Sequence, residues 1–154
     1  MSGYDQIHPG STAAAPAADG VANPTQALAW LRTTLIVLEV LLAIGAFGGA
    51  IALIVGAIDL GESAADLPFE SPVLGGVALL VINGLLPAAV AFGAFRRAPW
   101  SELGHVAVGV ALIAWILVQV AFIGFGSVLQ ATYLLYGVVV LVLGATRLAL
   151  LRRQ

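Results

Sequence analysis

A long apolar run at residues 31–58 constrains the fold of this chain more than any other feature. The run reads LRTTLIVLEVLLAIGAFGGAIALIVGAI. It exceeds the roughly 20 apolar residues that a helix needs to cross a bilayer. Three further apolar runs follow, at residues 73–95, 103–125 and 128–148. This pattern predicts an all-α fold, namely a four-helix transmembrane bundle.

The composition supports a membrane-embedded chain and excludes several kinds of chemistry. Hydrophobic residues make up 61% of the sequence and charged residues 9%, whereas a soluble domain is about 25% charged. The four runs and their loops leave no room for a soluble catalytic domain. Cysteine and lysine are absent, so disulfides, thiolate metal sites and lysine Schiff bases are excluded. No basic stripe is visible, and we expect no nucleic-acid partner.

The first 27 residues differ from the rest of the chain. They are polar and rich in alanine, proline and glycine, and such a composition buries too little apolar area to offset its ordering entropy. We expect a disordered cytoplasmic tail at residues 1–27 and a four-helix transmembrane domain at residues 28–154.

The arginines predict the orientation of the bundle. All of them fall on one side of the membrane if both termini are cytoplasmic, as expected from the retention of basic residues on that side. The four acidic residues of the loop at 59–71 then fall on the other side. The arginines are Arg32, Arg96, Arg97, Arg147, Arg152 and Arg153.

Glu39 is the only acidic residue within the first apolar run. A carboxylate in a bilayer is costly and should face protein or water. One interpretation is a structural ion pair with Arg32, Arg96 or Arg97, reaching inward from the cytoplasmic side. The other is a protonated carboxyl that serves as a proton or ligand site. The sequence leaves both open.

Glycines of the same run recur on one helix face. Gly45, Gly49 and Gly56 form this face, about 120° away from Glu39. Helices approach closely where no side chain separates their backbones. We expect these glycines to pack helices together, either within the bundle or at a dimer contact.

Two further polar positions lie within the apolar runs. Asn83 precedes Pro87 by four residues, and Pro87 has no N–H to bond the Asn83 carbonyl. This is either a kink that a neighbouring helix satisfies or a polar notch for a ligand. Gln119 follows Trp115 on one helix face and fits an interhelical hydrogen bond or a ligand contact. Glu39, Asn83 and Gln119 are therefore the candidate ligand or proton site.

No metal site or cofactor is expected. His8 and His105 have no neighbouring residues with metal-ligand spacing.

The chain resembles a family of small four-span bacterial integral membrane proteins. The resemblance rests on the early Glu39, on PFESPVLGG at residues 68–76, on the WILVQ of residues 115–119 and on the LQ that opens the last run. It implies a four-span fold in the bacterial cytoplasmic membrane. It implies no activity.

The features above favour a protein without enzymatic activity. No nucleophile–base pair, phosphate loop or pair of catalytic carboxylates is visible. The first hypothesis is an accessory or structural subunit that packs in a larger membrane complex or a homo-oligomer. The alternative is a small proton-coupled carrier, or a protein that binds lipid or another hydrophobic ligand, using Glu39.

Overall fold

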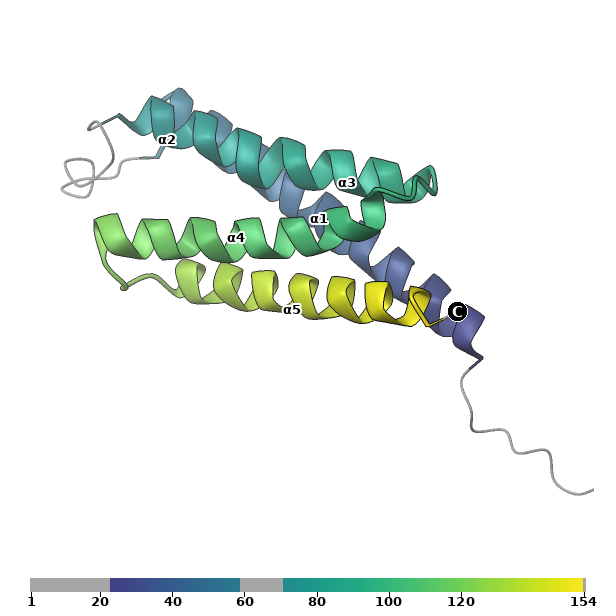
Figure 1. Ribbon diagram of the computed structural model, residues 1–154. Coiled ribbons are helices and arrows are strands. Elements are labelled where there is room, and N and C mark those ends of the chain that lie inside the picture. Colours follow the sequence, from purple (N-terminus) through teal and green to yellow (C-terminus); the bar gives the residue numbers. More distant parts are fainter. Residues whose placement is uncertain (1–22, 59–70, 154) are drawn as a thin grey trace, which may run out of the picture.

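A computed structural model describes residues 23–58 and 71–153, and this part of the chain is helical without strands. Three consecutive helical segments at residues 72–95 form one continuous rod, so the described residues contain four helices long and apolar enough to cross a membrane. The predicted four-helix, all-α architecture is confirmed (Figure 1). The elements are α1 (Pro24–Ile54), α2 (Pro72–Leu79), the π-helix η3 (Leu80–Leu85), α3 (Leu86–Phe95), α4 (Ser101–Ile123) and α5 (Val128–Leu151).

Local sequence signals explain where α1 begins and ends. The Asn23 side chain accepts a hydrogen bond from the Thr25 N–H at 3.2 Å, and Pro24 occupies the first turn. The helix therefore starts before the predicted span, within the segment expected to be tail. Gly56 has φ +71° and follows the last turn, which is a common way to end a helix. Most of the predicted tail, and the acidic loop at residues 59–70, lie outside the described residues.

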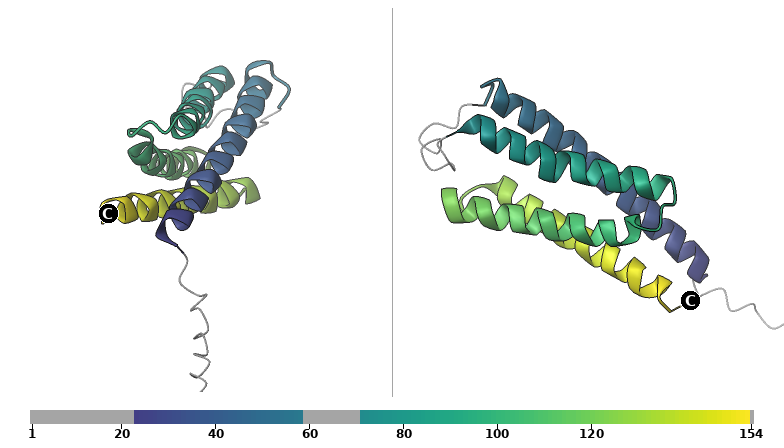
Figure 2. Two further views of the ribbon diagram at one scale, coloured as in Figure 1. Left: turned by 90° about the vertical axis from the view of Figure 1, so that its right-hand side faces the viewer. Right: turned by 45° about the horizontal axis from the view of Figure 1, so that its top comes forward.

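The four rods run alternately up and down. α1 crosses the others obliquely, as Figures 1 and 2 show. The first half of α1 contacts α5, and its second half lies along α2. α4 lies between α3 and α5. The helix α1 therefore contacts both the rod that contains α2 and the helix α5.

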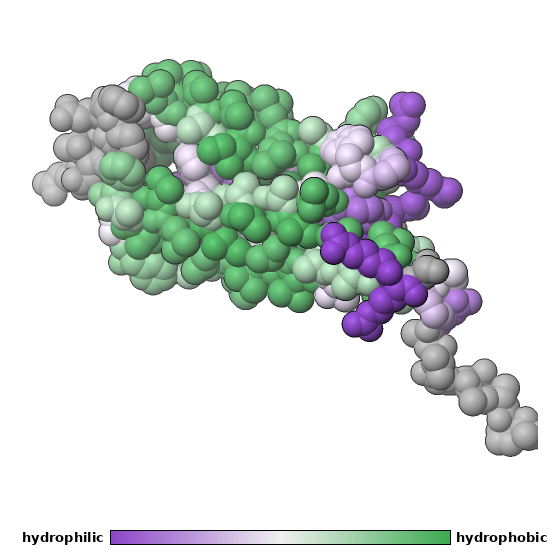
Figure 3. Space-filling model, viewed as in Figure 1, coloured by the Kyte–Doolittle hydropathy of each residue, from purple (hydrophilic) through white to green (hydrophobic). Residues whose placement is uncertain are grey.

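Hydrophilic side chains gather at one end of the molecule. The start of α1, the connection between α3 and α4, and the end of α5 meet there, and we call it the arginine end (Figures 1 and 2). Hydrophobic residues cover most of the face shown in Figure 3, and hydrophilic residues gather where the chain terminates. The opposite end comprises residues 54–58, 71–72 and 123–128. This distribution is expected for a bundle that crosses a bilayer.

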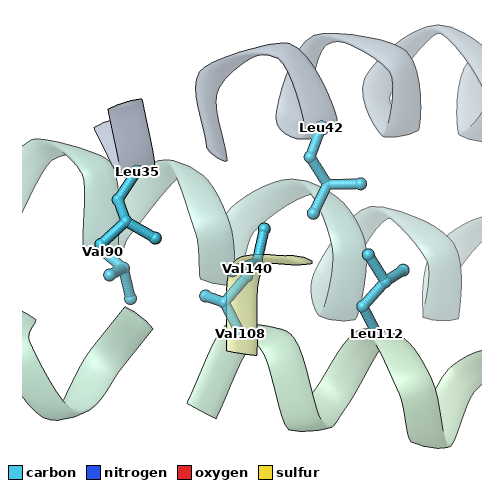
Figure 4. Packing of buried hydrophobic residues seen from close by; sticks show 6 residues of the cluster. All are labelled: Leu35, Leu42, Val90, Val108, Leu112 and Val140. Carbon is cyan, nitrogen blue, oxygen red and sulfur yellow. The ribbon is translucent and has the colours of Figure 1, made fainter. Parts of the chain in front are cut away.

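The apolar core lies midway along the bundle. It draws on α1, α3, α4 and α5, whose side chains point toward one another in Figure 4. Its residues are Leu35, Leu42, Val90, Val108, Leu112 and Val140.

Glycines bring α4 and α5 into very close contact. A Cβ on Gly109 would lie 2.6 Å from the Leu141 backbone nitrogen. A Cβ on Gly144 would lie 3.0 Å from the Cβ of His105. Small residues allow such approach because no side chain separates the backbones. Such packing was predicted for α1 from its glycines, whereas at Gly109 and Gly144 it is found only in the structure.

Candidate functional site

Glu39 and His105 form a fully buried pair between α1 and α4. The His105 Nδ1 lies 2.7 Å from the Glu39 Oε1, and both side chains are 0% exposed. A proton must lie between these two atoms for them to hydrogen-bond, so the pair carries at least one proton. Among the described residues, the second carboxylate oxygen and the second ring nitrogen have no hydrogen-bond partner.

Glu39 reaches this position because its helix face is the buried one. Leu35, Ala43 and Ala46 share that face and are buried with it. His105 fits because Gly144 on α5 has no side chain to displace it. The partner of Glu39 is thus a histidine, not one of the three arginines that one interpretation of the sequence offered.

A different arginine enters the bundle. Arg147 on α5 donates two hydrogen bonds to the Glu102 carboxylate on α4, from Nε and Nη2, each at 2.7 Å. Its Nη1 donates to the Leu28 carbonyl on α1. This side chain ties three helices together at the arginine end. Arg96 instead lies over the Phe92 ring, 5.7 Å from its centroid.

Tyr136 adds a further link between α5 and α1. Its hydroxyl donates to the Leu38 carbonyl at 2.6 Å, next to Glu39 in the chain. Together with the Glu39–His105 and Arg147–Glu102 pairs, it forms a hydrogen-bonded set of contacts in the arginine half. This set holds α1, α4 and α5 together.

A π-helix precedes the proline of the second rod, and the rod continues beyond it. η3 covers residues 80–85, and the N–H of Leu86 bonds to the Val81 carbonyl. One extra residue in the turn lets the helix continue past Pro87. Asn83 lies within η3, is 2% exposed, and neither its Oδ1 nor its Nδ2 has a hydrogen-bond partner in the described residues.

Asn83 lines a cavity of about 350 Å³ in the half of the bundle away from the arginine end. Gln119 and Trp115 of α4 line it as well, and so does Tyr133 of α5. Leu112, Ile116 and several other apolar or small residues complete the wall. The cavity size lies in the range of small-molecule sites.

Gln130 also lines the cavity, but the α4–α5 turn already uses its amide. Its Oε1 accepts from the N–H groups of Gly126 and Ser127, both at 3.2 Å. Its Nε2 donates to the Gly124 carbonyl at 3.1 Å. This explains Gln130 as a helix-capping residue.

The structure separates the three candidate residues into two places. Asn83 and Gln119 line the same cavity, whereas Glu39 does not line it and is paired with His105. Gly45 and Gly49 of α1 lie at the cavity wall, where added Cβ atoms would lie 3.3 Å from the Tyr133 hydroxyl and the Leu79 Cδ2. Gly56 is beyond the end of α1, and a Cβ there would meet nothing within 4 Å.

Sequence reasoning missed His105 as the partner of Glu39 and Arg147 as the buried arginine. One available signal was that His105 is the only histidine in the apolar runs. In residues 23–58 and 71–153, no group of three His, Asp or Glu side chains could hold a metal ion.

Comparison of the chain with families of known proteins, with curated proteins and with solved structures finds no match. The helices nevertheless define a class. Four spans of sufficient length and apolar character indicate a small multi-pass membrane protein in contact with the lipid bilayer. The resemblance to a bacterial four-span family stays a prediction.

Proposed function

We propose that this protein binds an uncharged, lipid-like molecule from the bilayer in the cavity lined by Asn83. The observation that carries this proposal is Asn83, a residue of the cavity wall that is 2% exposed and whose amide has no hydrogen-bond partner among the described residues. Leaving a buried polar group unsatisfied costs about 1–3 kcal/mol. A ligand that bonds this amide would recover that free energy.

The cavity wall suits a partly apolar ligand. Its described lining is mostly aliphatic, aromatic or glycine, with few polar groups. Water needs two to four polar partners to be stable in such a space. Five lining residues are exposed, so the cavity opens at the surface of the bundle: Gly45, Ile58, Ile123, Ser127 and Leu129. A molecule in the membrane can therefore enter from the side.

The fluorescence of Trp115 reports occupancy of the cavity. We expect brominated long-chain amphiphiles, added to the protein in nanodiscs of saturated phosphatidylcholine, to quench this fluorescence saturably. The Trp115→Phe variant measures the background quenching of Trp30 and Trp100, which are 68% and 55% exposed.

Two glycines of α1 supply a matched pair of variants. Gly45→Leu places a side chain at the cavity mouth and should weaken quenching about tenfold or more. Gly48→Leu lies outside the lining, meets nothing within 4 Å, and should leave quenching unchanged. Quenching that never saturates with any probe, or that is equal in both variants, would contradict the proposed function.

The second candidate function is an accessory subunit without enzymatic activity, in a homo-oligomer or a larger membrane complex. The observation that favours it is the uncovered glycine surface of α1. Gly48 is exposed, and a Cβ built there meets no atom within 4 Å. A second helix could approach this backbone closely.

Oligomeric state tests the second candidate. We expect the wild-type protein to migrate as an oligomer in mild detergent and Gly48→Leu to shift it to a smaller species, because the new side chain separates the helices. Gly75→Leu is the control, since a Cβ on Gly75 also meets nothing within 4 Å but Gly75 lies on α2. A wild-type monomer without a co-purifying partner argues against an accessory subunit.

We also propose that the arginine end faces the cytoplasm of a bacterial cell, with both termini on that side. The chain has no cysteine, so single cysteines can report the topology. A membrane-impermeant maleimide should label Gly126→Cys in intact cells and Pro99→Cys only after the membrane is opened. The reverse labelling pattern would show that the orientation assigned from the arginines is wrong.

A further inference from the structure

We infer that the cavity selects a long-chain molecule whose polar group is a planar carboxamide or an undissociated carboxyl group. This inference rests on the proposed binding function and specifies the chemistry of the ligand. The structural reason is that Asn83 presents a donor and an acceptor at the same time, and neither is used by the described residues.

The geometry of the Asn83 amide determines which polar group can hydrogen-bond to both of its atoms at once. The Oδ1 and Nδ2 of Asn83 lie in one plane, on adjacent corners of a rigid group. A partner with its own C=O and N–H, or C=O and O–H, in one plane forms two parallel hydrogen bonds with this edge. Asparagine recognises other planar groups by the same paired contact. A hydroxyl, an ester or a ketone satisfies only part of this edge.

The position of Asn83 makes this edge a fixed feature. The residue lies within η3, which the fixed ring of Pro87 and the α3 helix follow directly. Its side chain is 2% exposed, so bulk lipid and water have little access to it. A rigid, desolvated polar group discriminates between ligands more strongly than an exposed one.

The remaining polar groups of the wall agree with a neutral ligand. Gln119 lines the same cavity, is only partly buried, and forms no side-chain hydrogen bond with the described residues. Its amide can bond the outer side of the ligand's polar group. None of the described lining residues is charged, so the described wall offers neither a cation for a phosphate nor an anion for an ammonium group.

The apolar part of the cavity wall suits a hydrocarbon chain. From Asn83 the lining continues past Leu79 and Leu53 toward Ile58, which are all apolar. The polar group would therefore lie against η3, and the chain would extend toward the opposite end and the membrane.

Quenching of Trp115 by three brominated probes of equal chain length tests the inference. The probes are a stearamide, the methyl ester of the same acid and a stearyl trimethylammonium salt. We expect the amide to half-saturate at about tenfold lower concentration than the ester, because the ester has no donor. The ammonium probe should show no saturable quenching.

Two variants assign this preference to particular side chains. Leucine is similar in shape to asparagine. Asn83→Leu should therefore weaken binding of the amide probe to the level of the ester probe, and it should leave binding of the ester unchanged. Gln119→Leu alters a partly exposed position and should weaken binding of the amide probe about threefold. Circular dichroism and gel filtration establish that each variant folds.

The outcomes separate the inference from the function on which it rests. Equal, saturable binding of amide and ester would overturn the inference while the binding function stands. A preference for the amide that persists in a folded Asn83→Leu variant would overturn it too. If no probe quenches saturably in the wild-type protein, the proposed function itself fails.

Discussion

Replacing Glu39 with leucine is expected to destabilise the bundle by about 3 kcal/mol. Leaving a buried polar group without its hydrogen-bond partner costs about 1–3 kcal/mol. The upper end applies because both side chains are 0% exposed, so the remaining His105 imidazole cannot bond to bulk water instead. It would still keep ring nitrogens without a partner, and the Glu39 Oε1 that now lies 2.7 Å from Nδ1 would be gone.

A double-mutant cycle isolates the pair. Glu39→Leu/His105→Leu removes both polar groups, and replacing a buried pair by apolar residues is often neutral or stabilising. We expect the double variant to be more stable than either single variant, with a coupling of about 1–3 kcal/mol. Unfolding in mixed micelles with increasing sodium dodecyl sulfate measures each free energy.

Glu39→Gln serves as the conservative variant in this cycle. Glutamine is nearly isosteric with the neutral acid and can still hydrogen-bond Nδ1. The Glu39→Gln variant should therefore lose less stability than the Glu39→Leu variant. Strictly additive single variants would show that the two side chains do not stabilise one another, in spite of their contact.

Replacing Arg147 with methionine is expected to cost about 3 kcal/mol. Methionine keeps much of the aliphatic stem and removes the bonds to the Glu102 carboxylate and the Leu28 carbonyl. Hydrogen bonds that involve a charged group contribute about 1.5–3 kcal/mol each. Glu102 is 21% exposed, so water compensates part of the loss.

Arg152→Met is the matched control for this variant. Arg152 lies next to the end of α5 and is exposed, so its replacement should change the free energy of unfolding by less than about 0.5 kcal/mol. Equal effects of the two substitutions would mean that net charge at the arginine end, rather than the Arg147 contacts, stabilises the bundle.

Much of the candidate site follows from the sequence because polar groups are rare and costly in apolar runs. This rule draws attention to Glu39, Asn83 and Gln119, and it applies equally to His105 and Arg147. It does not say which of them meet. That depends on the rotation and tilt of each helix, and similar apolar side chains on all sides of a helix leave its rotation undetermined. The structure places two of the three residues at one cavity and buries Glu39 elsewhere.

The sequence by itself determined the number of spans, their approximate limits and the gathering of arginines at one end. These properties depend on chain length and local hydrophobicity, and each run carries its own information. Tertiary structure alone decided the pairing of Glu39 with His105, the three-helix contacts of Arg147 and the close approach of α4 to α5 at Gly109. Each of these joins residues far apart in the chain, and such contacts depend on how neighbouring helix surfaces fit together. No local pattern encodes that fit.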